Sequence, residues 1–116
     1  MFPQRATIAV TTDASGDATG YSENITGQIL EVHYIKTDFD DGSTFAVTLE
    51  KTGETVWSES AVNASTVRRP RQTMHDSAGA DQTTYAETVA AVNDRVKWVV
   101  SSGGNVKSGT LEIVYA

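Results

Sequence analysis

Polar and apolar residues alternate along most of this chain, and no other sequence feature restricts its fold as strongly. Two stretches show the alternation most clearly, each with one apolar face: Leu30, Val32 and Tyr34 in residues 28–36, and Phe45, Val47 and Leu49 in residues 43–51. Successive residues of a strand point to opposite sides, so this pattern is typical of strands that are buried on one face. The pattern predicts an all-β protein.

The same alternation returns in residues 94–100 and 109–115, and turns rich in Gly, Asp and Asn separate the strands. Short strands at intervals of about ten residues are typical of an antiparallel β-sandwich or a jelly-roll-like barrel. Residues 1–116 are expected to form a single domain, because a chain of this length has little surplus for a second core. We expect the last two strands to pair as a hairpin, and residues 6–12 to form an edge strand or a swapped arm.

Residues 62–83 interrupt this pattern, because they lack sustained periodicity. They are predicted to form an unusually long loop, and loops of this kind often carry function or become ordered on a partner. Residues 84–92 are compatible with two helical turns or with a strand, and the strands around them favour extended structure.

The net charge of -6 is divided unevenly along the chain. Residues 1–60 hold ten acidic and three basic residues, a balance of -7, whereas residues 61–116 hold five acidic and six basic residues, a balance of +1. An acidic protein repels phosphate backbones, which argues against sequence-specific nucleic-acid binding. Because the two halves of the chain carry opposite net charges, copies or partners could associate with an acidic face against a basic face. No stretch approaches the roughly 20 apolar residues that span a membrane.

Residues that could perform reaction chemistry are few. Residues 38–43 superficially resemble a calcium-binding loop, but Gly42 stands fifth and Leu49 twelfth, where that loop needs an oxygen ligand and a Glu. His33 and His75 lack the spacing of a zinc site, and the chain has no cysteine. Residues 75–77 are adjacent, whereas a catalytic triad converges in space. We therefore expect a hairpin turn at residues 38–43, and no enzymatic activity, metal or cofactor.

Six residues are candidates for contacts with partners: Arg68, Arg69, Arg71, Trp57, Phe39 and Tyr21. The three arginines form the densest charge in the chain, and guanidinium groups can clamp carboxylates or phosphates. The acidic first half favours protein carboxylates, and the alternative is a solvated loop. Trp57, with Tyr21 or Phe39, could anchor an interface, because aromatic residues outside a core are enriched there. The alternative for the aromatic residues is a second packed sheet face.

Several segments together resemble a family of small structural proteins of tailed bacteriophages and prophages: residues 10–19, 34–45, 52–54, 62–65, 94–97 and 102–110. The resemblance covers most of the chain and includes no catalytic motif. It implies a virion component that is present in many copies and is assembled in the host cytoplasm. The arginine-rich stretch at residues 68–71 departs from the family pattern, so no contact role is transferred to it from the family.

The resemblance leaves the place of the protein in the virion open. The favoured interpretation is a capsid decoration or cement protein that forms homo-oligomers and binds the major capsid protein or other virion proteins. The first alternative is a head-to-tail connector or a tail ring component. A second alternative, from a different class, is a carbohydrate-binding receptor module, because exposed Trp57 and tyrosine rings on a sandwich could stack against sugars.

Overall fold

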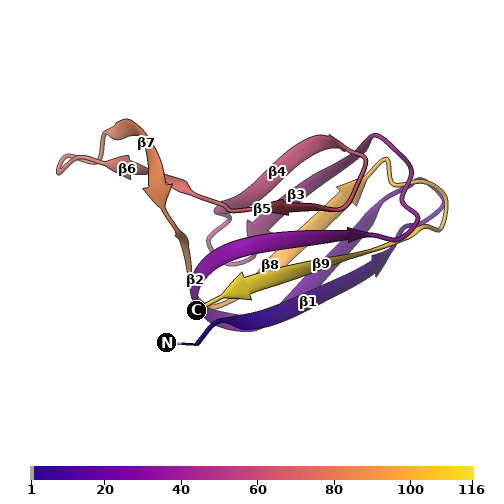
Figure 1. The fold of residues 1–116 in the computed structure, drawn as a ribbon, viewed down its shortest axis with the longest axis horizontal. Helices are drawn as coiled ribbons and strands as arrows, with labels where there is room; N and C mark the ends of the chain where they lie inside the picture. The colour runs from indigo at the N-terminus through magenta and orange to yellow at the C-terminus, as the bar shows by residue number, and fades with distance from the viewer. Residues whose placement is uncertain (1) are drawn as a thin grey trace.

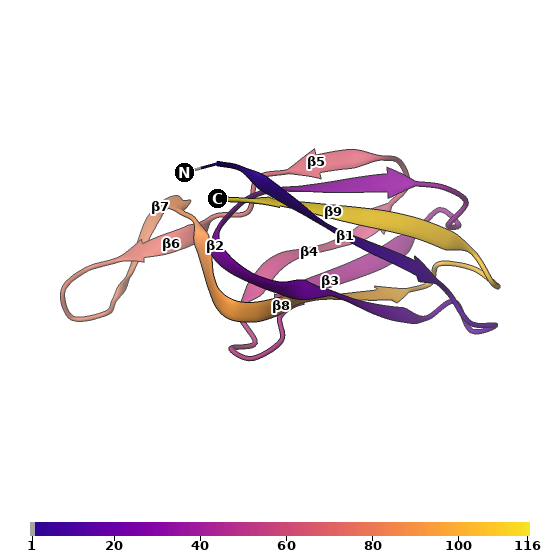
Figure 2. The ribbon, with the colours of Figure 1, turned by 90° about the horizontal axis from the view of Figure 1, so that it is seen from below.

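A computed structural model describes residues 2–116, which contain only β-strands and no helix (Figures 1 and 2). The strands are β1 (Gln4–Thr11), β2 (Ala18–Lys36), β3 (Ser43–Leu49), β4 (Thr55–Val62), β5 (Thr66–Arg68), β6 (Gln72–His75), β7 (Asp81–Glu87), β8 (Val89–Ser101) and β9 (Ser108–Tyr115). Every paired strand is antiparallel to its neighbour. The prediction of an antiparallel β-sandwich is therefore confirmed.

The body is one continuous hydrogen-bonded sheet folded into two layers, which we call the first and the second sheet of the sandwich, and strand β2 belongs to both. Residues 18–29 of β2 pair with β8, and residues 29–36 pair with β9. Strands β3 and β4 extend the first sheet beyond β8, while β1 and β5 flank the second sheet beside β9 and β2. The change of sheet follows Gly27, whose φ of 143° lies in a region that side-chain-bearing residues rarely adopt. A single strand thus joins the two layers.

Two β-bulges explain where the alternation of burial breaks. In β2, Ile29 and Glu31 pair with the consecutive residues Tyr115 and Val114, so Leu30 is the extra residue and is only half-buried. The prediction that Leu30 faces inward with its neighbours on that face is therefore wrong, and Ile29 takes its place in the core.

The second bulge lies in β4 and turns two adjacent residues inward. Trp57 pairs with Val47, and Thr55 pairs with the next residue, Thr48, so Val56 is the extra residue. Val56 and Trp57 are both buried as a result, although neighbours in a regular strand face opposite sides.

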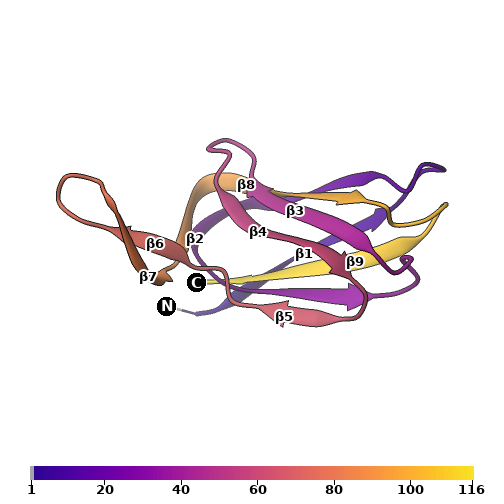
Figure 3. The same cartoon turned by 90° about the horizontal axis from the view of Figure 1, so that it is seen from above.

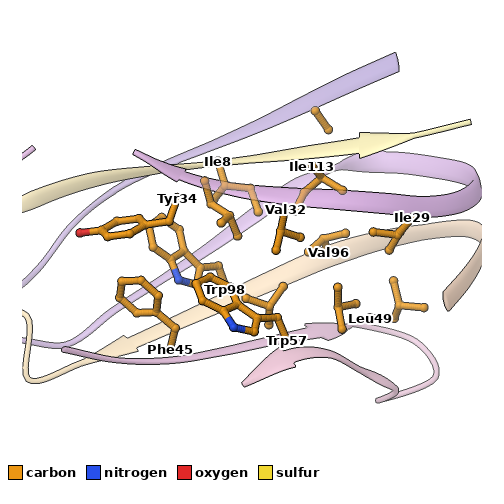
Figure 4. Packing of buried hydrophobic residues seen from close by; sticks show 14 of the residues in the cluster. Ile8, Ile29, Val32, Tyr34, Phe45, Leu49, Trp57, Val96, Trp98 and Ile113 are labelled. Carbon is orange, nitrogen blue, oxygen red and sulfur yellow. The ribbon is translucent and has the colours of Figure 1, made fainter. Parts of the chain in front are cut away.

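Aromatic rings fill the space between the sheets (Figure 4). The Trp98 ring lies 5.2 Å from the Phe45 ring and 6.1 Å from the Tyr34 ring, measured between centroids. Trp57 packs edge-on against Phe45 at 5.6 Å. Burial raises the pKa of Tyr34 to about 12, with a smaller contribution from the negative charge of Asp38. Edge-to-face pairs of this kind add to the stabilisation from buried apolar area.

Two turns that were predicted to close hairpins instead connect strands that are not neighbours. Residues 94–100 and 109–115 do not pair with each other, because β8 lies between β2 and β3 whereas β9 lies between β1 and β2. The turn at residues 38–43 likewise joins β2 to β3, which have no pairing between them among residues 2–116. Both connections meet the β1–β2 turn at one end of the sandwich, where Asp40 N–H donates to Gly103 O and Gly103 N–H donates to Gly16 O.

The predicted long loop at residues 62–83 is largely strand. Strand β5 pairs with β2 at the open side of the sandwich, and β6 and β7 pair with each other as a separate hairpin. Residues 84–92 are extended, as expected, and run from β7 into β8. Strand β1 is an edge strand that pairs with β9 of its own chain.

Candidate functional site

The hairpin of β6 and β7 projects from one end of the sandwich, and we call these residues, 72–87, the arm. Figures 1 and 3 show the arm reaching past the end that carries both termini, away from the body formed by the other strands. The described residues extend over 48 × 29 × 23 Å, so the molecule is elongated. The arm is its most prominent surface feature.

Hydrogen bonds within the arm define the shape of its tip. Asp76 Oδ1 accepts from the N–H groups of Ala78 and Ala80, at 2.9 Å and 3.0 Å. Asp76 N–H in turn donates to Ala80 O. His75 Nε2 lies 2.9 Å from Asp81 Oδ1 across the two strands. These contacts shape the turn, but they bury no apolar surface.

The arm has little support from the body. Among residues 2–116, one hydrogen bond joins the two parts: Gln72 Nε2 donates to Thr55 O at 3.1 Å. No ion pair links arm and body within this range, and all residues of β7 are exposed. A two-stranded hairpin is at best marginally stable in water when no further strand or apolar surface covers it. The arm is therefore the part of the fold that gains the least stabilisation from the rest of the chain.

The arm exposes two large apolar side chains. Tyr85 of β7 is 67% exposed, and Met74 of β6 is exposed as well. Thr73 lies opposite Tyr85, so Met74, the next residue of β6, points to the other face of the arm. Exposed apolar side chains on a hairpin are typical of surfaces that contact other molecules.

Arg68 closes the open side of the sandwich. Its Nε and Nη2 donate to the two carboxylate oxygens of Glu59 at 2.9 Å and 3.1 Å, which links β5 to β4. Trp57 Nε1 donates to the same carboxylate at 3.2 Å. The hydrogen bonds from Arg68 lower the pKa of Glu59 against an opposing effect of burial, and Trp57 adds to the lowering. Arg68 therefore has a carboxylate partner within its own chain, and its predicted role as a contact for another molecule stays a prediction.

Arg69 and Arg71 lie at the base of the arm. Arg69 is well exposed and lies near Glu31, with 3.5 Å between Nη2 and Oε2. Arg71 Nη1 donates to Leu30 O at 3.3 Å and to Pro70 O at 2.7 Å. These bonds attach the base of the arm to the bulge of β2, and they leave the positive charge of Arg71 without a carboxylate partner among residues 2–116.

Two of the three aromatic candidates are core residues. Trp57 and Phe39 are 7% and 2% exposed, so neither presents a ring to a partner. The prediction that they anchor an interface is wrong, because the β4 bulge turns Trp57 inward and the β2–β3 connection folds Phe39 over the end of the core. Tyr21 remains on the surface at 42% exposure, and its ring carries the Arg95 guanidinium 4.2 Å from the centroid.

The other residues considered for metal binding or catalysis do not come together in one site. Asp38 Oδ1 accepts from Ser108 N–H and Asp41 pairs with Lys36, so these carboxylates serve the local connection. Within residues 2–116, no group of three or more His, Asp or Glu side chains could hold a metal ion. Asp76 is bound to the tip of the arm and does not meet His75 as a triad would require. Residues 2–116 contain no helix that is long and apolar enough to span a membrane.

The arm residues were missed by reasoning from the sequence, although a signal for them was present. Met74 and Tyr85 are isolated large apolar residues within a polar stretch that contains no lysine or arginine, residues 72–87. Isolated apolar residues between many polar ones cannot form a core of their own. This combination indicates a segment that relies on another surface for its burial.

No protein-family model matches this chain, and no curated protein matches its sequence.

Proposed function

We propose that this protein is a non-enzymatic structural component of a bacteriophage virion, and specifically a capsid decoration or cement protein. The single observation that carries the assembly role is the arm, a hairpin with exposed apolar side chains on both faces and almost no support from its own body. An element of this kind gains its stability when another folded chain covers it. The resemblance of residues 34–45 and 102–110 to small virion proteins supports the choice of a phage particle.

The mechanism would be the addition of many modest contacts. Each copy would lie over a seam between capsid subunits and would contact its neighbours through the arm. Binding to the folded state alone stabilises that state by mass action, and linked contacts strengthen each other through high effective concentration. Repetition over a shell would then turn weak individual contacts into resistance against the internal pressure of packaged DNA.

The carbohydrate-binding alternative loses its main argument, because Trp57 is buried and the ring of Tyr21 is covered on one side by Arg95. A neck or tail ring remains the competing location for a virion component.

The test is the position of the protein in an intact particle. A tagged copy would be produced during infection, the particles would be purified, and the tag would be labelled for electron microscopy. We expect label over the whole head at many sites. Label confined to the neck or tail would replace the cement role with the ring role, and unlabelled particles would contradict the virion assignment.

A further inference from the structure

The charges at the tip of the arm and at its base have opposite signs. Residues 76–81, which form the tip of the arm, contain two acidic side chains, Asp76 and Asp81, and no lysine or arginine, whereas Glu87 pairs with Gln72 at the base. The preceding residues 68–71 contain three arginines, a balance of +3. Arg68 is neutralised by Glu59, whereas Arg69 is well exposed and lies 3.5 Å from Glu31. The tip of the arm is thus complementary to the base of an identical arm.

Antiparallel side-by-side placement of two arms would use this complementarity twice. A two-fold axis between them brings the acidic tip of each arm to the arginine base of the other, which is the self-complementary arrangement of a symmetric dimer. The two hairpins together would form a four-stranded sheet, which has the strand number that an isolated hairpin lacks. The exposed apolar residues of both arms would be partly covered in the same step.

The charges also select the strand at the contact. If β7 paired with its own copy in antiparallel fashion, Asp81 would lie near Glu87 at both ends, and like charges opposite each other are destabilising. Strand β6, Gln72–His75, contains no acidic residue, and it is flanked by Arg71 on one side and Asp76 on the other. Antiparallel pairing of two β6 strands therefore brings opposite charges together and places the two Met74 side chains near the axis.

We propose that the partner of the arm is the arm of a second copy of this chain, paired along β6 about a two-fold axis. This inference rests on the proposed assembly role, and it names the segment through which copies join. Charge complementarity between tip and base and the free edge of β6 carry it.

The first experiment uses the absence of cysteine from the chain. Met74→Cys introduces a single thiol at the expected axis, and Asn105→Cys introduces a thiol at another exposed position, in the loop at the opposite end of the sandwich. Under mild oxidation of dilute protein, we expect Met74→Cys to form a covalent dimer at least about tenfold faster, because disulfides require closely opposed Cβ atoms. Equal rates for the two variants would contradict the proposal.

The second experiment exchanges charges between copies. Arg69→Glu and Asp81→Lys should each weaken self-association about tenfold or more, measured by sedimentation velocity, because each reverses a charge at the base or at the tip of the arm, which lie side by side in the dimer. An equimolar mixture of the two variants should associate as well as the wild type, since the mixed dimer has opposite charges at tip and base on both sides of the axis. Lys107→Glu, the same charge change at the far end, should leave association unchanged. A mixture that stays as weak as its components would overturn the proposal.

These results can be separated from the test of the proposed function. A protein that labels heads but shows neither Met74→Cys cross-linking nor charge-swap rescue would refute arm pairing and leave the cement role standing, with the arm bound to the shell. Arms that pair while particles stay unlabelled would refute the virion assignment alone.

Discussion

The body and the arm are both antiparallel β-structure, yet the chain stabilises them in different ways. In the body, inward residues of β3, β8 and β9 are almost entirely excluded from water, with the aromatic rings packed between two sheets. In the arm, strand pairing is present but no strand residue is fully buried: β7 is exposed throughout, and β6 is at most half-buried. Burial of apolar surface, rather than strand pairing, is the main stabilising term in folding. The difference indicates that the body is stabilised by its own core, whereas the arm gains little stabilisation from the rest of the chain.

The largest expected effect is in the core of the body. Trp98→Ala removes the ring that packs against Phe45 and Tyr34, and we expect the free energy of unfolding to fall by about 3–5 kcal/mol, as for other large-to-small core changes. Urea denaturation followed by tyrosine and tryptophan fluorescence would measure it. The control, Val99→Ala on the outer face of the same strand, should change stability by less than about 1 kcal/mol. Equal losses would mean that β8 is not buried on one face only.

The next effect is at the corner of β2. Gly27→Ala adds a methyl group whose carbon would lie 2.7 Å from Ala116 O, at a φ that already disfavours any side chain. We expect a loss of about 2–3 kcal/mol, from overpacking together with backbone strain. Gly42→Ala is the matched control, because its φ of 87° is also unfavourable but nothing lies within 4 Å of the added carbon. It should lose only about 1 kcal/mol, and comparable losses would leave no separate role for the close approach to Ala116.

A smaller effect is expected where Arg68 closes the side of the body. Arg68→Ala should cost about 1 kcal/mol at neutral pH, a modest value because both partners are partly exposed to water. The folded state holds the pKa of Glu59 below its usual value, so the stabilisation is complete above that usual value and disappears as pH falls through the lowered one. Unfolding measured at pH 7 and again at about pH 3 should therefore show the difference between wild type and Arg68→Ala shrink. A difference that stayed constant would point to packing of the arginine stem instead.

The smallest effect is expected in the arm. Tyr85→Ser should change the unfolding free energy of dilute protein by less than about 0.5 kcal/mol, because the ring is mostly in water. Hydrogen exchange should show fast exchange of arm amides and strong protection in β8 and β9. A loss of more than about 1 kcal/mol, or equal protection in both regions, would mean that the arm is stabilised by the body, and the contrast between them would fail.

The alternation of polar and apolar residues was sufficient to predict the fold class and most inward residues. Val96, Trp98 and Val100 in β8, and Leu111 and Ile113 in β9, are all buried as predicted. Alternation specifies which face of a strand is buried, but it carries no information about which strand lies alongside. For this reason, the pairing of residues 94–100 with 109–115 was predicted wrongly, and β2 lies between the two strands.

The candidate site was harder to predict, because it depends on contacts between distant residues. The arginine-rich stretch is visible in the sequence, but the partner that occupies Arg68 is Glu59, which reaches it only because β4 and β5 lie along the same open side of the sandwich. Trp57 looked like a surface residue because Val56 is adjacent, and a bulge is not visible in a single sequence. The isolation of the arm likewise becomes apparent only when its surroundings are known.

The shared strand β2 has a mechanical consequence. Arg71 attaches the base of the arm to Leu30 O, in the part of β2 that follows its change of sheet. A pull on the arm would pass along the chain into β5 and β8, and both of these strands pair with β2, which is bonded to β8 on one stretch and to β9 on the other. The load would be distributed over both layers along the strand direction, so many bonds would resist it together in shear instead of opening one after another.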